Sequence, residues 1–331
     1  MNALPVQSVP GPMSARYLEL QRALGKGFHT EQWILESLDR WLIENGSADL
    51  DPENFTAWCK SQQHLASGVR RQRMRVVRNF CLYRRRSEPS CFVPDLHAFP
   101  ANHQPLPPYI FTEAQIARLI QAADRLEPHP LSLIRAQVYR LAIVLLYTTG
   151  LRRGELLRLK IGDYDPRQQT LFVRQSKFHK SRYLPLSVDT AREIAAYLGV
   201  RRHRHLPLSP ETPLIWNRGK NGTAYSGGGL GQGLRALFRQ AEIRTPEGRL
   251  PRLHDIRHSF AVNVLLRWYR TGADLRAKLP LLATYMGHVS IVSTERYLHF
   301  IDELAAHASD RFNAHYGAAV VPLAKAQGGE R

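Results

Sequence analysis

The chain has 331 residues, of which 44% are hydrophobic and 22% are charged. These values are ordinary for a folded protein; they exclude a largely disordered chain and leave room for two domains. The longest apolar run, residues 141–147, is too short to span a bilayer, and the N-terminus lacks the basic flank and apolar run of a secretory signal. We therefore expect a cytoplasmic protein without a membrane partner. Three cysteines without C-x-x-C spacing argue against a disulfide framework or a cysteine-rich zinc site.

The formal net charge is +18, which favours a polyanionic partner, most often nucleic acid. The charge is unevenly distributed along the chain. Residues 1–60 carry five Lys or Arg against eight Asp or Glu, whereas residues 61–86 carry eight arginines and no acid. This local excess indicates a basic surface within the N-terminal part.

The first 90 residues have the pattern of a small helical bundle. Thr30 is a candidate N-cap for a helix that ends near Asn45-Gly46, and Asp51-Pro52 is typical of the start of another. In the arginine-rich segment that follows, apolar residues recur on one helical face, so the opposite face can offer guanidinium groups to phosphates. The candidate DNA contacts are Arg70, Arg71, Arg75, Arg78 and Arg85. The alternative is a solvated charged face.

A proline-rich stretch separates this bundle from the rest of the chain. Residues 87–110 contain six prolines and no helical period, which is typical of an extended linker. We predict a helical domain over residues 14–90, a linker over 91–110, a second domain over 111–317 and a flexible tail over 318–331.

The second domain reads as mainly helical with a small β-hairpin. Thr112 and Gln115 form a capping box, and helical patterns extend over residues 134–147 and from about 229 to about 316. Between them, residues 170–175 and 182–186 resemble two strands joined by a polar turn. We expect residues 163–165 to form a turn, and the glycine-rich run 226–233 to be a flexible loop that enters a helix.

No nucleotide or metal motif is convincing. The glycine run lacks a preceding strand, and residues 218–223 lack the Walker A pattern, so we expect no cofactor. His254 and His258, one helical turn apart, could hold zinc as in H-E-x-x-H hydrolases. Asp255 replaces the glutamate of that motif, and Arg257 would repel a cation. A zinc-dependent hydrolase therefore stays open only as a minority alternative, and we predict no metal.

Five short motifs follow one another in the second domain. The segment TGLRRGELL contains Arg152, and SKFHKSRYLPL lies across the hairpin and contains Lys177. HDIRHSFA, MGH and ERYLHF follow. In this order and spacing, residues 111–316 resemble the tyrosine recombinase (phage integrase) family. The resemblance implies catalytic roles for Arg152, Lys177, His254, Arg257, His288 and the nucleophile Tyr297, with Glu155 as a supporting residue. Ser176 and Phe178 stand where glycines are common in the family, which predicts a stiffer loop around Lys177.

The chemistry fits these residue types. Planar guanidinium groups can clamp a phosphate bidentately, a tyrosine hydroxyl can attack it, and a lysine can protonate the leaving 5′-oxygen. The resemblance implies a mainly α fold, in which a helical core-binding (SAM-like) domain and a catalytic domain enclose duplex DNA. It also implies a 3′-phosphotyrosyl intermediate and a homotetramer on two recombination sites, with related recombinases or accessory proteins as further possible partners.

The segment RYLHFIDELAAHASDRF resembles those of recombinases of transposons and other integrating elements, which implies integration or transposition of a mobile element over chromosome-dimer resolution. Apolar residues at helical spacing in 301–316 predict a helix that covers its own domain or docks on a neighbouring protomer, and the tetramer that the resemblance implies favours docking. The alternatives are a non-catalytic basic DNA-binding protein with a degenerate site and a topoisomerase-like relaxing enzyme.

Overall fold

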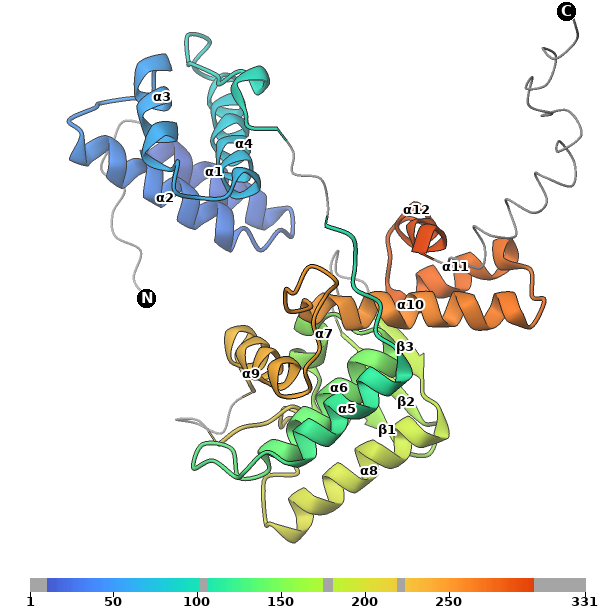
Figure 1. Cartoon of the computed structure of the whole chain (residues 1–331). Coiled ribbons are helices and arrows are strands. Elements are labelled where there is room, and N and C mark those ends of the chain that lie inside the picture. Colours follow the sequence, from blue (N-terminus) through green and yellow to red (C-terminus); the bar gives the residue numbers. More distant parts are fainter. Residues whose placement is uncertain (1–10, 102–105, 175–180, 219–223, 301–331) are drawn as a thin grey trace, which may run out of the picture. The chain divides into compact units, whose positions relative to one another are not determined.

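The computed structural model describes residues 11–101, 106–174, 181–218 and 224–300, and it divides the chain between Leu106 and Pro107 (Figure 1). This division lies inside the proline-rich stretch. No helix among the described residues is long and apolar enough to cross a membrane.

The N-terminal unit is a bundle of four helices and a short 3-10 turn. Its core is formed by apolar faces of α1, α2, α3 and α4, around Leu42, Trp58 and Phe80. The predicted cap of α3 is confirmed, because the Asp51 side chain accepts a hydrogen bond from the amide of Asn54. The elements are α1 Gly11–Ala23, α2 His29–Glu44, α3 Pro52–Ser61, α4 Ser67–Arg84 and η1 Leu96–Ala98.

The expected cap of α2 is wrong. The helix begins at His29, so Thr30 lies within its first turn, and Phe28 occupies the N-cap position with a left-handed backbone (φ 49°). The ring of Phe28 packs edge-on against Tyr17 of α1, with ring centroids 5.9 Å apart. An apolar contact with another helix therefore sets this boundary, where a local hydrogen bond was expected.

The C-terminal unit is built around α6, which is buried along most of its length and packs against α5, α8 and α10 (Figure 1). The capping box of α5 is confirmed, since Thr112 and Gln115 bond each other's backbone amides. The helices are α5 Glu113–Asp124, α6 Arg135–Thr149, α7 Arg153–Arg158, α8 Val188–His203, α9 Gly227–Gln240, α10 Leu253–Arg270, α11 Leu275–Met286 and α12 Val292–Glu295, with 3-10 turns η2 Ile161–Asp163 and η3 Arg296–Phe300.

The predicted hairpin is present and has one more strand. β1 Tyr164–Asp165, β2 Thr170–Val173 and β3 Arg182–Pro185 form an antiparallel sheet in that order. Leu171 faces Leu184 in the register of β2 and β3, and both side chains are fully buried. The turn expected at residues 163–165 is corrected in part: Tyr164 and Asp165 pair with β2, and the Asp165 carboxylate accepts amide hydrogen bonds in the turn that follows.

The glycine-rich run is helical, contrary to expectation. Ser226 caps α9, which starts at Gly227, so the run forms the first turns of this helix. A Cβ at Gly233 would overlap the hydroxyl of Tyr139 on α6. Close packing of two helices, and not a need for a flexible loop, therefore explains glycine at this position.

Candidate active site

The turn after α6 positions the first motif. Gly150 ends α6 with φ 61°, and any side chain there would overlap the ring of Phe260 on α10. Leu151 is buried, and Arg152 then stands at the N-cap position of α7. α7 begins at the next residue, and the Arg152 side chain lines a pocket together with Leu253 and His254 at the start of α10.

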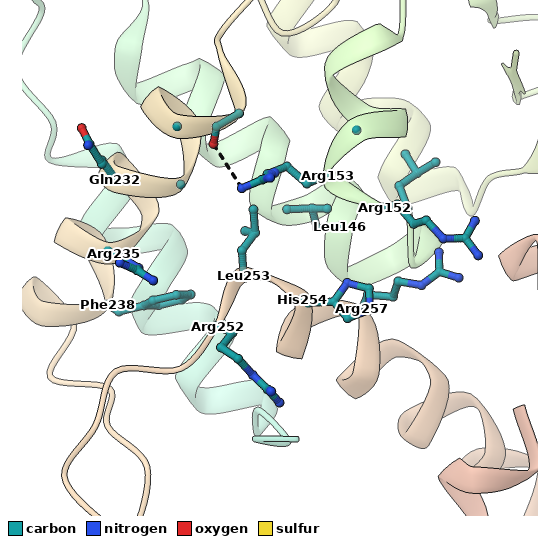
Figure 2. Close-up of a pocket in the computed structure, with 15 residues that line it drawn as sticks. Leu146, Arg152, Arg153, Gln232, Arg235, Phe238, Arg252, Leu253, His254 and Arg257 are labelled. Carbon is teal, nitrogen blue, oxygen red and sulfur yellow. Dashed lines mark hydrogen bonds between the residues drawn. The ribbon is translucent and has the colours of Figure 1, made fainter. Parts of the chain in front are cut away.

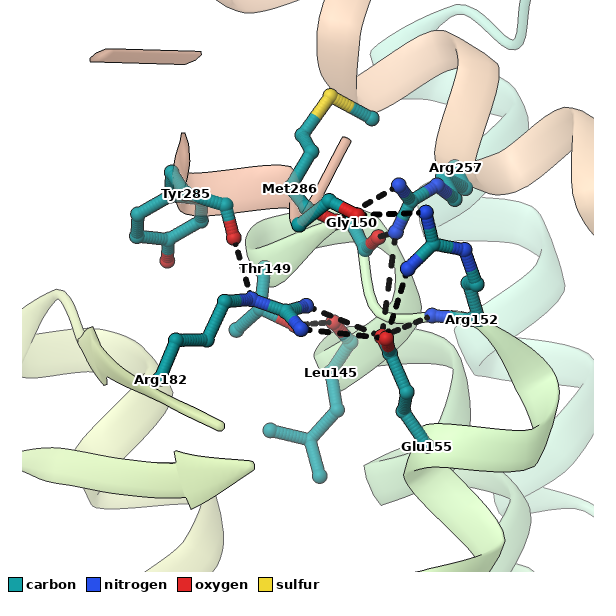
Figure 3. A network of polar contacts seen from close by, with 10 residues as sticks. Leu145, Thr149, Gly150, Arg152, Glu155, Arg182, Arg257, Tyr285 and Met286 are labelled. Carbon is teal, nitrogen blue, oxygen red and sulfur yellow. Dashed lines mark hydrogen bonds and ion pairs between the residues drawn. The ribbon is translucent and has the colours of Figure 1, made fainter. Parts of the chain in front are cut away.

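A buried carboxylate, Glu155, organises the arginines of the site (Figure 3). It accepts hydrogen bonds from the backbone amide and Nη1 of Arg152, at 3.0 and 2.8 Å, and from both Nη atoms of Arg182, at 3.1 and 3.0 Å. Arg257 Nη1 lies 4.0 Å away. Burial opposes ionisation of Glu155, but the hydrogen bonds from Arg182 and the Arg152 amide outweigh it and lower the pKa of the carboxyl to about 2.

The two motif arginines are held by main-chain carbonyls at helix ends. Arg257 is 1% exposed and donates to the carbonyls of Gly150 and Met286, the latter at 2.8 Å. Arg152 Nη2 donates to the carbonyl of Gly287 at 2.8 Å. Burial and the Arg152 charge lower the pKa of Arg257 to about 10, so its guanidinium stays charged at neutral pH.

Tyr297 lies on η3, within a small core shared with α10 and α11, and is 3% exposed. Its hydroxyl is 2.9 Å from Nδ1 of His258. Burial raises the pKa of Tyr297, while the charges of Arg257, Arg296 and Arg152 act in the opposite direction. The phenol is therefore protonated in the resting protein, although several cations face it.

Three imidazoles surround this hydroxyl and the arginines. The ring of His258 lies edge-on to His254, with centroids 4.6 Å apart, and the ring of His288 stacks on Tyr297 at 6.2 Å. His288 Nδ1 pairs with the hydroxyl of Thr294 at 2.7 Å. Burial and neighbouring arginines lower the pKa of His254 and His288 to about 4, so both rings are neutral at pH 7.

A pocket of about 640 Å³ opens beside the arginines (Figure 2). Five arginines and one of the histidines line it, and its lining includes no acidic residue. Arg153 Nη1 is oriented by the carbonyl of Gly227 at the start of α9, 3.3 Å away. The pocket is suited to an anion, and its polar lining is formed by Arg152, Arg153, Arg235, Arg252, His254 and Arg257, with Gln232 beside them.

Comparisons with known proteins agree with this geometry. The profile of the phage integrase family matches residues 110–303. The chain belongs to the phage integrase family. It is 31% identical to the putative integrase/recombinase y4rB of Sinorhizobium fredii, over 91% of this chain and 96% of that protein. It is also 31% identical to the tyrosine recombinase XerA of Pyrococcus furiosus, over 62% of each chain.

The fold has solved counterparts in this family. The XerH site-specific recombinase, in a post-cleavage complex with palindromic difH substrate, aligns with a TM-score of 0.62. The alignment has 19% identity and covers 86% of this chain and 79% of that one. The predicted family, the mainly α fold class with a small sheet, and the enzyme class, a site-specific recombinase of the tyrosine type, are confirmed.

The structure brings most of the predicted site residues of this integrase family member together. Lys177 lies outside the described residues. The supporting position of Glu155 beside the first arginine is observed, with a second cation, Arg182, that sequence reasoning missed. The other predicted residues lie around the Glu155 carboxylate or in the histidine cluster beside the phenol of Tyr297. They are Arg152, Arg257, His254 and His288.

Two residues of the site were not predicted as such. Arg182 begins β3, within the SKFHKSRYLPL segment that carried the resemblance, but nothing in its spacing indicated a buried partner. His258 was considered only as a zinc ligand. Its spacing of four from His254 on α10 was a usable signal for a place in the site. Among the described residues, no three His, Cys, Asp or Glu side chains form a group that could hold a metal ion.

The arginines in and just after α4 differ in exposure. Arg75 and Arg85 are exposed, whereas Arg70, Arg71 and Arg78 are half-buried. Arg84, counted in the basic stretch of the sequence, is 2% exposed and pairs with Asp49 and Glu88, so it is structural. The absence of acids between residues 61 and 86 therefore overstated the basic surface, because this arginine finds its carboxylates elsewhere in the bundle.

Proposed function

We propose that this protein cuts and rejoins duplex DNA at specific sites through a covalent 3′-phosphotyrosyl intermediate on Tyr297. The observation that carries the proposal is the meeting of two guanidinium groups, three neutral imidazoles and a buried phenol from four separate segments. This set matches the demands of phosphodiester transesterification: a nucleophile, donors for the nonbridging oxygens and groups that move protons.

The two arginines act on the phosphate. Arg152 is a quarter exposed at its side chain and lines the pocket, and Arg257 lies behind it with fixed hydrogen bonds. Glu155 and the helix-end carbonyls hold both side chains in place before the substrate binds, so little reorganisation is needed when negative charge develops. An arginine aimed at a transferring phosphoryl group can contribute about 10³–10⁵ in rate.

The remaining roles follow from the family pattern and from chemistry. His254 lines the pocket and can donate a hydrogen bond to a phosphate oxygen, and His288 can do so from the other side of Tyr297. Lys177 would protonate the 5′-oxygen that leaves. The phosphotyrosyl ester conserves the energy of the broken bond, so a 5′-hydroxyl can reseal the strand without a cofactor.

Duplex DNA is the proposed partner, bound chiefly through phosphates. The acid-free pocket of the C-terminal unit extends from Arg257 past Arg153 to Arg235, beyond the space that one phosphate needs. Exposed Arg75 of α4 and exposed Arg85, which follows that helix, offer further contacts in the N-terminal unit. Affinity should therefore fall steeply with salt. We assign DNA binding to the helical N-terminal unit and catalysis to the C-terminal unit.

We place the reaction in the integration or transposition of a mobile element. The similarity to the putative integrase/recombinase y4rB, which aligns along nearly its whole length, supports this assignment. A tetramer on two DNA sites, with related recombinases or accessory proteins where needed, is the assembly that we propose.

The test is capture of the covalent intermediate. The full-length protein is incubated with a library of randomised duplexes, each with a nick that traps cleaved strands, and adducts are isolated in detergent and sequenced. The wild-type protein should yield an adduct with an enriched site, Tyr297→Phe should yield none, and Tyr164→Phe, a matched change on β1, should behave as the wild type. No adduct with the wild type, while duplex binding persists, would favour the non-catalytic alternative.

A further inference from the structure

Transfer of a phosphoryl group to Tyr297 requires that its hydroxyl lose a proton. The arginine side chains of the site are cationic and cannot accept one, and Glu155 is saturated by arginine hydrogen bonds. An acceptor must lie within hydrogen-bond reach of the hydroxyl. Nδ1 of His258 lies there, at 2.9 Å.

The fold holds His258 in this position from both sides. His254, one turn earlier on α10, packs edge-on against its ring, and the ring of Tyr297 lies 5.4 Å from it, centroid to centroid. His254 is directed to the pocket, where a phosphate would lie. The two histidines of the H-x-x-R-H segment therefore face different reacting groups, one the phosphate and the other the nucleophile.

The surroundings keep the His258 ring uncharged until DNA arrives. Burial, His254, and the charges of Arg252, Arg257 and Arg296 lower the pKa of His258 to about 3, so a ring nitrogen is free of a proton at neutral pH. A bound phosphate adds negative charge beside Arg152 and Arg257. This charge offsets part of the repulsion and makes the imidazole a stronger base when it is needed.

We propose that His258 is a catalytic residue, the general base that takes the proton of Tyr297. With its own proton on Nε2, His258 accepts the phenolic proton at Nδ1 while the phenolic oxygen bonds to phosphorus. The bond from phosphorus to the 5′-oxygen breaks, and that oxygen takes a proton from Lys177. In rejoining, the 5′-hydroxyl returns its proton to Lys177 as its oxygen bonds to phosphorus. The bond from phosphorus to the phenolic oxygen breaks, and that oxygen recovers its proton from Nδ1. This proposal rests on the proposed function.

The experiment separates the base from the acid. Single-turnover cleavage is measured on nicked duplexes that carry the site enriched in the capture experiment. The 5′-bridging atom is either oxygen or sulfur, because a thiolate can leave without being protonated. His258→Asn keeps a hydrogen-bond acceptor but cannot take a proton at neutral pH. We expect cleavage to slow by about 10²–10⁴ on both substrates. The rate should also rise tenfold per pH unit, as hydroxide replaces the base. Lys177→Ala, by contrast, should cleave the oxygen substrate slowly and recover its cleavage rate on the sulfur substrate.

Two further measurements keep the test decisive if a variant folds poorly. Thermal unfolding and duplex binding are recorded first, and His258→Ala is assayed with and without added imidazole, which should restore cleavage. In the wild type, cleavage of the sulfur substrate should be at least about twofold slower in D₂O, since the tyrosine proton still moves. His258→Asn cleaving within threefold of the wild type, or no isotope effect, would overturn the proposal and leave the proposed function intact. Failure of the wild type to form any adduct would remove both.

Discussion

Replacing Glu155 with glutamine removes the one carboxylate that Arg152 and Arg182 bond and that Arg257 approaches. The pKa of Glu155 falls from an ordinary 4.5 to about 2 in the folded chain. At about 1.4 kcal/mol per pKa unit, this corresponds to about 3 kcal/mol of stability for the ionised form. The value agrees with the roughly 3–5 kcal/mol lost when one partner of a buried pair is removed.

The sign of the pH dependence follows from the lowered pKa. An acid with a lowered pKa contributes its full stability above 4.5, the value in the unfolded chain, and loses it as the pH falls toward about 2. The unfolding constant of Glu155→Gln, relative to that of the wild type, should therefore be largest at pH 7. Near pH 3 the ratio of the two unfolding constants should fall to about ten.

Hydrogen exchange of the full-length chain, read by mass spectrometry on peptides of α6 and α10, measures this effect within the unit concerned. At pH 7 these amides should exchange about 300-fold faster in Glu155→Gln. The control is Glu211→Gln, since Glu211 pairs with Lys160 at the surface and its side chain is 79% exposed. Exchange within about fivefold of the wild type, or a difference that grows toward low pH, would refute the reasoning.

Three other predictions follow from single contacts. Arg152→Ala or Arg257→Ala should keep duplex binding in a mobility-shift assay yet lower covalent adduct formation by about 10³ or more; full cleavage by either would defeat the assignment of the clamp. Gly233→Ala should cost about 1–3 kcal/mol in urea unfolding because its Cβ would overlap Tyr139, and unchanged stability would show that α6 and α9 can separate freely. Arg84→Met should destabilise the helical unit by about 2 kcal/mol, seen by tryptophan fluorescence. Arg75→Met should instead leave stability unchanged and reduce the slope of log affinity against log salt concentration by about one. A loss of stability in Arg75→Met, with a reduced slope in Arg84→Met, would contradict the assignment of Arg84 as structural and of Arg75 as a DNA contact.

The sequence by itself determined the features that depend on neighbours within a few residues. The capping box at Thr112, the start of α3 at Asp51, the β2–β3 hairpin and the end of α6 at Gly150 each follow from local hydrogen bonds or backbone preference. The order of the five motifs was also enough to indicate the family, because each motif is short and continuous.

Only the tertiary structure decided which charged groups are bound and which stay available. Arg84 meets Asp49 across 35 positions, Arg257 meets the Gly150 carbonyl across 107, and Arg152 meets that of Gly287 across 135. The glycine run lies in a helix that packs against α5, α7 and α10, where the Tyr139 side chain leaves no room for a Cβ at Gly233. His258 became a partner of Tyr297 because η3 returns to α10. Burial and long-range contact set these outcomes, and neither is encoded in the spacing of nearby residues.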